Sequence, residues 1–157
     1  MHKVPVGVLG ASGYAGRELC GLIARHPSLE LVFAAAQEQR GQRARIGGSE
    51  ITFVASEDAP LGKAEVVFTA LPHGAAATWV GNSRAVGARV VDLSSDFRPG
   101  AATGAVAPYG LTELMRDQIP GSEIIARLFE EISRTKLLAP TMRAAVGSAG
   151  PTPWWRW

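Results

Sequence analysis

The segment from Val6 to Gly16 reads V-G-V-L-G-A-S-G-Y-A-G, an apolar run that breaks into glycines. The whole apolar run, Val4 to Leu9, has the composition of a buried parallel strand, and helical spacing follows the break. Three evenly spaced glycines fill the break: Gly10, Gly13 and Gly16. At a strand-to-helix turn, such glycines permit a tight turn, close approach of the main chain to a pyrophosphate, and close helix packing. The segment therefore predicts a dinucleotide-binding turn, with a purely structural turn as the alternative.

The residues after the glycines complete a strand–helix–strand unit. A helix is predicted from Ala15 to His26, and Pro27 ends it. The apolar face of this helix is formed by Ala15, Leu19, Leu22 and Ile23. Leu29 to Ala36 is a second buried run, so the two strands should be parallel with a right-handed connection. The N-terminus of the helix would direct free N–H groups at the turn, which favours a phosphate there.

Further buried runs extend this alternation along the chain. Strands are predicted at Val66–Ala70, Arg89–Leu93 and Glu123–Ala126, with a short one at Ile51–Ala55. Helices are predicted at Ala75–Val86 and Leu111–Ile119, and a loop at Gly41–Gly48. The fold class is therefore α/β: a Rossmann-like, doubly wound, mostly parallel sheet with helices on both faces. Gly10 to Gly16 should lie at its switch point.

Composition limits the classes of function. The chain has 157 residues, 46% hydrophobic and 19% charged, which is typical of one globular domain. A net charge of +2 argues against nucleic acid or an anionic membrane as partner. Neither a membrane-spanning run nor a signal peptide is evident, so a cytoplasmic location is expected. The single cysteine, Cys20, excludes an internal disulfide and a thiolate metal cluster, and its apolar neighbours favour a core position.

The end of the second strand is where such folds contact the adenosine ribose. The sequence there continues from Ala36 into Gln37-Glu38-Gln39-Arg40, with Arg43 and Arg45 close behind. Arginines without a carboxylate at the strand tip favour the 2′-phosphate of NADP, and Arg40 is the first candidate. Glu38 is the residue that could reverse this preference, and a solvated basic loop is the alternative for Arg43 and Arg45.

Two later strands also end in polar residues. Leu71-Pro72-His73-Gly74 follows one strand, and Ser94-Ser95-Asp96-Phe97-Arg98 follows the next. Because parallel strands end at one edge of the sheet, we expect both segments at the ligand-binding edge. For His73, a plain loop or capping role is the alternative.

Taken together, four blocks of sequence resemble the N-acetyl-γ-glutamyl-phosphate reductase family, an NADP-dependent oxidoreductase of arginine biosynthesis. The blocks are Gly10–Gly16, Leu71–Gly74, Asp92–Arg98 and Tyr109–Glu113, the last with threonine where proline is usual. A sister family that acts on an aminoadipyl phosphate in lysine biosynthesis has nearly the same blocks and stays open. The order and spacing fit from Val4 to about Ala126, so residues 1–126 are expected to form the NADP-binding domain.

The resemblance also implies a reaction and a set of site residues. In the family a cysteine thiolate attacks a small-molecule acyl phosphate, phosphate leaves, and hydride from NADPH reduces the thioester to a semialdehyde. Together with Arg40 and His73, which are candidates from the strand ends, the resemblance gives the predicted cofactor contacts: Gly10, Ala11, Ser12, Gly13, Tyr14, Ala15, Gly16, Arg40, Leu71, Pro72 and His73. Substrate contacts are implied for Ser94 and Arg98, no metal is implied, and the family forms homo-oligomers.

The sequence departs from the family after Ala126. The family continues Asn-Pro-Gly-Cys, whereas this chain reads Arg127-Leu128-Phe129-Glu130, so Glu130 stands where the nucleophilic cysteine is expected. Residues 127–157 resemble no part of the family and include three tryptophans near the end. This tail is expected to be disordered or frameshifted, with a short helix at Leu128–Leu138 as the alternative.

Two interpretations follow. In the first, the chain is a truncated N-terminal piece of the reductase that binds the cofactor and is inactive alone, in which case homo-oligomer formation is doubtful. In the second, it is a non-catalytic NADP-binding or interaction module whose tail contacts a partner. Whether the chain is an enzyme therefore stays open at this stage.

Overall fold

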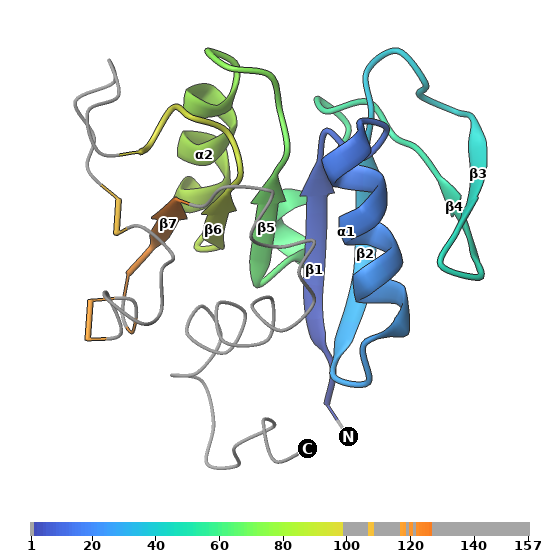
Figure 1. The fold of residues 1–157 in the computed structure, drawn as a ribbon, viewed down its shortest axis with the longest axis horizontal. Helices are drawn as coiled ribbons and strands as arrows, with labels where there is room; N and C mark the ends of the chain where they lie inside the picture. Colours follow the sequence, from blue (N-terminus) through green and yellow to red (C-terminus); the bar gives the residue numbers. More distant parts are fainter. Residues whose placement is uncertain (1, 99–106, 109–116, 119, 121, 127–157) are drawn as a thin grey trace.

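The computed structural model describes residues 2–98, 107–108, 117–118, 120 and 122–126. These residues form a five-stranded parallel sheet of order β2-β1-β5-β6-β7 and a separate two-stranded hairpin (Figure 1). In chain order, the elements are β1 (Val4–Leu9), α1 (Tyr14–Arg25), β2 (Leu29–Ala35), β3 (Arg43–Ile46), β4 (Ser49–Thr52), the 3-10 turn η1 (Leu61–Lys63), β5 (Val66–Thr69), α2 (Ala76–Ala85), β6 (Arg89–Asp92) and β7 (Ile124–Ala126). The predicted Rossmann-like α/β fold is confirmed.

The strand order defines the switch point. The chain first places β2 on one side of β1, and then returns to place β5 on the other side. The turn after β1 therefore lies where the winding reverses, which is the position at which open α/β sheets bind ligands. The predicted strands are confirmed with ends one residue shorter at β2, β5, β6 and β7, and α1 lies one residue earlier than predicted.

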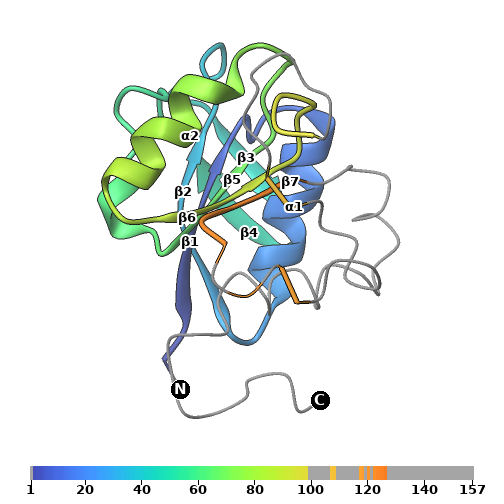
Figure 2. The same ribbon diagram turned by 90° about the vertical axis from the view of Figure 1, so that its left-hand side faces the viewer.

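Side chains that alternate along the strands divide the core between two faces. Figure 2 shows α1 and α2 on opposite sides of the sheet. Val66 and Phe68 belong to the core under α1, which includes Leu19 and Ile23 of that helix. On the α2 side, Val80 packs with neighbours such as Val90, Phe97 and Ala107. Burial of each large aliphatic side chain contributes about 1.5–3 kcal/mol to the free energy of folding. Both helices are therefore held against the sheet mainly by apolar packing, one on each face.

The hairpin β3–β4 corrects the prediction of a loop at Gly41–Gly48. Gly47 and Gly48 both have positive φ, 59° and 88°, as a two-residue hairpin turn requires. The side chains of Ile46 and Ile51 are buried in the core that includes α1, and this burial fixes the hairpin beside the helix. The predicted strand at 51–55 is correspondingly shorter, since β4 ends at Thr52 and the chain then bridges to β2 only at Val54.

Several predictions fall on other residues. The predicted tail helix at 128–138 lies outside the described residues, and the domain boundary after Ala126 falls at their end. Of the predicted helix at 111–119, only Asp117 and Gln118 are described, and both lie in a turn. Cys20 is fully buried in the α1 core, and burial raises the pKa of its thiol to about 12. In the described part of the chain, no helix has the length and apolar character needed to cross a membrane.

Candidate functional site

The glycine turn is compressed between β5 and α1. Gly10 has φ +81°, and a Cβ added to it would lie 2.3 Å from the carbonyl oxygen of Ala70. A Cβ added to Gly16 would lie 2.2 Å from the carbonyl oxygen of Gly10. Both separations are far below van der Waals contact, so a side chain at either position would displace the turn. Two of the three predicted roles, the tight turn and the close packing of the helix, are therefore accounted for by contacts.

The middle glycine leaves the turn open. Gly13 is the N-cap of α1 with extended backbone, and its nearest neighbour to an added Cβ is 3.5 Å away. Among the described residues, no side chain caps this helix end, and its first turn holds no acidic residue. The N–H groups of Gly10 and Ala11 are bonded to the carbonyl oxygen of Ala35 at 3.0 and 2.8 Å, which ties the turn to β2. A helix start without a side-chain cap favours an anion, and the hydrogen bonds to β2 fix its position.

The remaining residues of the predicted loop line the same turn. Ser12 and Ala15 are partly buried, whereas Tyr14 begins α1 with 83% of its surface exposed. These positions are compatible with the predicted cofactor contacts, which stay predictions.

The tip of β2 presents Arg40 to solvent. Its Nη1 donates to the main-chain oxygen of Gln37 at 3.1 Å. Gln37 is itself held, because its amide oxygen accepts from the N–H of Ser56 and its amide nitrogen donates to Glu57. Arg43, by contrast, is paired with Glu50 across the hairpin at 3.2 Å. Arg40 is thus bonded to a neutral acceptor, whereas Arg43 has an acidic partner.

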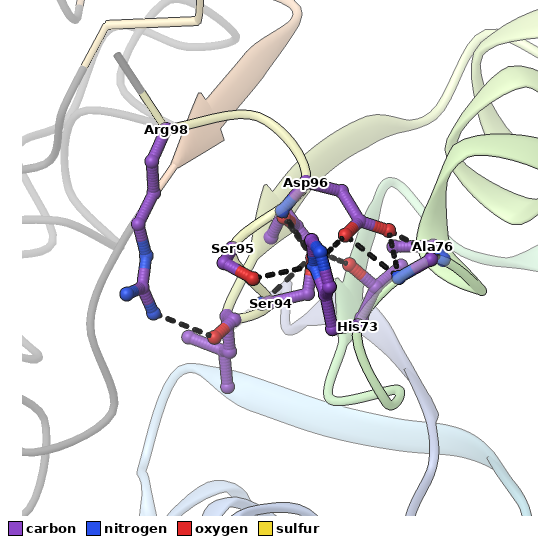
Figure 3. A network of polar contacts seen from close by, with 10 residues as sticks. His73, Ala76, Ser94, Ser95, Asp96 and Arg98 are labelled. Carbon is purple, nitrogen blue, oxygen red and sulfur yellow. Dashed lines mark hydrogen bonds and ion pairs between the residues drawn. The ribbon is translucent and has the colours of Figure 1, made fainter. Parts of the chain in front are cut away.

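The loops after β5 and β6 are joined by one buried carboxylate, Asp96 (Figure 3). Its Oδ1 accepts from the N–H of Gly74 at 2.8 Å and lies 2.6 Å from Nδ1 of His73. Its Oδ2 accepts from the N–H of Ala76 at 3.0 Å. Asp96 is only 2% exposed, whereas the side chain of His73 is 73% exposed. Asp96 therefore caps the N-terminus of α2 from a loop about twenty residues later in the chain.

These contacts set the charge of Asp96. Burial alone would raise the pKa of the carboxyl group, but the N–H bonds from Gly74 and Ala76 and the contact with His73 outweigh it, so the pKa lies below its usual value. Asp96 is consequently a carboxylate at neutral pH.

A second buried carboxylate occupies the end of β6. Asp92 accepts from the hydroxyl of Thr69 at 2.5 Å and from the hydroxyl of Ser94 at 2.6 Å. The Ser94 oxygen also accepts from the N–H of Asp96 at 3.0 Å. The hydroxyl of Ser94 is therefore already committed within the protein, and its predicted substrate contact stays a prediction.

Arg98 lies at the end of the same loop. One of its Nη atoms is 3.5 Å from the carbonyl oxygen of Leu93, and its buried Nε has no acceptor among the described residues (Figure 3). This guanidinium keeps donor capacity for a ligand, so the predicted substrate contact of Arg98 also stays open.

The glycine turn and the two loops form one edge. The chain passes from β5 into Ala70 and Leu71, whose main-chain atoms are the ones that an added Cβ at Gly10 would strike. The α1 terminus, the His73 loop and the Asp96 loop thus gather at the carboxyl ends of β1, β5 and β6. Sequence reasoning singled out His73, Ser94 and Arg98 but gave no role to Asp96. The available signal was an aspartate following a buried strand.

Comparison with known proteins agrees with this geometry. Residues 5–122 match the family described as semialdehyde dehydrogenase, NAD binding domain. The chain belongs to this family. A nicotinamide dinucleotide is therefore the class of cofactor for this semialdehyde dehydrogenase NAD-binding domain, and the glycine turn, with its open helix end, fits such a group.

Curated relatives carry a more specific name. The chain is 37% identical to the N-acetyl-gamma-glutamyl-phosphate reductase of Archaeoglobus fulgidus, with 77% of this chain and 42% of that protein covered. It is 35% identical to the protein of the same name from Ectopseudomonas mendocina, with 94% of this chain and 49% of that protein covered. The chain thus spans less than half the length of these relatives.

Solved structures share the fold. Aspartate semialdehyde dehydrogenase II of Vibrio cholerae, complexed with ASA, aligns at a TM-score of 0.67 and 21% identity, covering 80% of this chain and 42% of that one. A probable aspartate-semialdehyde dehydrogenase of Pseudomonas aeruginosa aligns at 0.64 and 23% identity, covering 81% and 38%. At these identities the likeness extends to the architecture of the semialdehyde dehydrogenase NAD-binding domain.

Proposed function

We propose that this chain is the NADP(H)-binding part of an N-acetyl-γ-glutamyl-phosphate reductase. The observation that carries the proposal is the open N-terminus of α1 at the switch point, in a chain whose curated relatives bear that name. The reaction of the whole enzyme would be the reduction of a small-molecule acyl phosphate to a semialdehyde. The sister aminoadipyl-phosphate reductase is distinguished by the same assays with the longer substrate.

Three parts of the edge would divide the cofactor. The pyrophosphate would lie on the N–H groups at the start of α1, where no protein carboxylate competes in the described residues. The 2′-phosphate of the adenosine half would pair with Arg40, whose guanidinium is exposed at the end of β2. The nicotinamide half would lie against Leu71, Pro72 and His73, beyond β5. The cofactor supplies hydride when bound, while these residues hold and orient it.

The preference for NADP(H) over NAD(H) is tested by titration calorimetry. Wild type should bind NADPH more tightly than NADH, and Arg40→Ala should remove most of the difference. Losing one charge-assisted phosphate contact costs about 1.5–3 kcal/mol, roughly ten- to a hundredfold in affinity. Arg43→Ala is the matched control, because Arg43 is paired with Glu50. Equal affinities of wild type for NADPH and NADH would contradict the proposal, and an effect in Arg43→Ala alone would move the role to that residue.

A second measurement concerns catalysis. The thioester route needs a reactive thiolate near the nicotinamide, and burial raises the pKa of Cys20, the single cysteine, to about 12. We therefore expect the 157-residue chain to bind the cofactor without oxidising NADPH in the presence of N-acetyl-γ-glutamyl phosphate. Glu130→Cys alone should not restore turnover. Turnover that survives both Glu130→Ala and Cys20→Ala would overturn this expectation.

The glutamate at the cysteine position favours a second candidate, a non-catalytic NADP-binding module. The two candidates differ in what replacement of the residues after Ala126 achieves. Fusing the family's Asn-Pro-Gly-Cys continuation and catalytic domain to residues 1–126 should yield turnover if this domain belongs to a reductase. A fusion that binds NADPH but remains inactive favours the module.

A further inference from the structure

We propose that Asp96 is a positioning residue that fixes the tautomer of His73 and the turn around Gly74 for the nicotinamide end of the cofactor. The proposal rests on the proposed function, because that function places His73 beside the nicotinamide. Figure 3 shows Asp96 among the polar groups of the two loops, with His73 and Ala76 on one side.

Several polar contacts converge on the side chain of Asp96. The two carboxylate oxygens accept from the N–H groups of Gly74 and Ala76 and contact Nδ1 of His73 at 2.6 Å. These partners lie in the second half of the segment that leads from β5 into α2, and at the first residue of that helix. Gly74 has φ +85°, a backbone conformation that glycine adopts without strain and that residues with a side chain rarely adopt, so the glycine permits the turn that Asp96 contacts. A single residue from the β6 loop thus holds the end of the β5 loop at the start of α2.

The contacts of Nδ1 determine which ring nitrogen of His73 carries the proton. Nδ1 of His73 lies 2.6 Å from Oδ1 of Asp96 and 2.6 Å from Oγ of Ser95. Since Asp96 is a carboxylate, Nδ1 must carry the hydrogen, with the Ser95 oxygen as a second acceptor. In the neutral ring, Nε2 then holds the lone pair. A carboxylate orients a histidine and selects its tautomer in the same way in hydrolase triads.

Asp96 and His73 differ in their exposure to solvent. The buried Asp96 cannot meet a ligand directly, whereas the side chain of His73 is mostly exposed. The effect of Asp96 on a ligand must therefore pass through His73 and the main chain of the turn. A residue that only stabilised the fold would influence both halves of the cofactor alike, but a positioning residue should influence the nicotinamide half alone.

The chain contains its own reference for the tautomer. Nδ1 of His26 accepts a hydrogen bond from the N–H of Ser28 at 3.2 Å, so the hydrogen of its neutral ring must be on Nε2. Burial lowers the pKa of His26, which keeps this ring neutral near pH 7. His26 and His73 should therefore show opposite tautomers in one spectrum.

The first experiment is long-range proton–nitrogen NMR of the imidazole rings in the full chain at about pH 8.5, two units above the ordinary histidine pKa. We expect the hydrogen on Nδ1 in His73 and on Nε2 in His26. In Asp96→Asn, His73 should shift toward the Nε2–H form while His26 stays unchanged. An Nε2–H tautomer of His73 in wild type would overturn the inference.

The second experiment separates the two halves of the cofactor. Affinities for NADPH and for 2′,5′-ADP, which lacks the nicotinamide half, are measured in wild type and Asp96→Asn. We expect Asp96→Asn to weaken NADPH binding about tenfold, as for the loss of one hydrogen bond that His73 makes to the cofactor, and 2′,5′-ADP binding by less than about twofold. His73→Ala should show the same split. Glu30→Gln, which removes a charge at the start of β2, is the control and should change neither.

The outcomes are distinguishable. Binding of neither ligand by wild type would overturn the proposed function and this inference together. Wild-type binding with equal losses of both ligands in Asp96→Asn, or with no loss, would overturn the inference and leave the proposed function standing. If Asp96→Asn does not fold, the wild-type tautomer and the His73→Ala binding split still decide.

Discussion

The N-termini of α1 and α2 meet the same edge of the sheet, but they are completed in opposite ways. The first turn of α1 has no side-chain cap and no acidic residue in the described chain. The start of α2 is closed by the buried carboxylate of Asp96, which accepts from the N–H groups of Gly74 and Ala76. Both helix starts have N–H groups that lack an acceptor within the helix, and both carry the positive end of a helix dipole. The difference therefore distinguishes a helix end available to a ligand from one that the protein has satisfied itself.

The turns before α1 and α2 are also held by different kinds of contact. The turn before α1 gains its shape from close main-chain packing at Gly10 and Gly16. The turn before α2 gains its shape from a side chain on another loop. Steric packing leaves the start of α1 without a side-chain cap among the described residues, whereas Asp96 caps the start of α2. Substitutions should therefore affect the two ends through different forces.

The largest expected effect is on the packing of α1. Gly16→Ala places a methyl group 2.2 Å from the Gly10 oxygen, which requires the helix to move away from the turn. We expect a loss of about 3 kcal/mol in the free energy of unfolding, at the upper end for overpacked sites. Urea unfolding followed by circular dichroism measures it. Gly13→Ala, with its nearest contact at 3.5 Å, is the control and should cost less than about 1 kcal/mol. Equal costs would contradict the close-packing role of Gly16.

The next effect is on the closed end of α2. Asp96→Asn should destabilise the protein by about 2 kcal/mol at pH 7, because it removes a buried charge-assisted cap. The pKa of Asp96 is lowered in the folded state, so its contribution is complete above the ordinary aspartate value of about 3.9. As the pH falls below that value and through the lowered folded-state pKa, the contribution is lost. Unfolding of wild type and variant at pH 7 and pH 3 should show the gap shrinking, and a pH-independent gap would contradict the assignment.

The smallest effect converts the open end into a closed one. Gly13 has φ −68° and ψ 168°, a conformation that any N-cap residue adopts. Gly13→Asp should therefore leave stability unchanged or raise it by a few tenths of a kcal/mol, while the new carboxylate competes for the N–H groups. We expect NADPH affinity to fall about tenfold, equivalent to about 1.4 kcal/mol.

Gly13→Asn is the matched control for this substitution, since it offers a cap without a negative charge. It should weaken NADPH less than Gly13→Asp does. Wild-type affinity in Gly13→Asp would mean that the α1 end does not hold a phosphate.

Much of the fold could be predicted because its signals are local. The runs that became β1 and β5 are almost entirely apolar, and those that became β2 and β6 are mainly apolar apart from Glu30, Arg89 and Asp92, as expected of strands covered on both faces. The hairpin β3–β4 was not predicted because most side chains of its two strands are polar and exposed. Its usable signal was the pair Gly47–Gly48 between Ile46 and Ile51, the two isoleucines that are buried against the α1 core.

The site was predicted in part for the same reason. The glycine turn and the polar strand ends can be recognised from neighbouring residues in the sequence. The cap on α2 cannot, because the local rule examines the N-cap position, here Ala75, which has no capping side chain. The group that does the capping arrives from the β6 loop, and only the register of β5 with β6 brings it into reach. The hydrogen bond from the hydroxyl of Ser94 to Asp92 is a further contact that the sequence does not reveal, and the predicted substrate contact of Ser94 stays a prediction.

The burial of Cys20 has a practical consequence for labelling. Its thiol is fully buried and its pKa is raised to about 12, so maleimide reagents at pH 7 should leave it untouched while the protein is folded. A cysteine introduced at an exposed position such as Val86 would then be the only site to take up a fluorophore or spin label, without removal of the native thiol. Slow modification of Cys20 itself would require α1 to open from the sheet, so the rate of modification would measure the rate of this local unfolding.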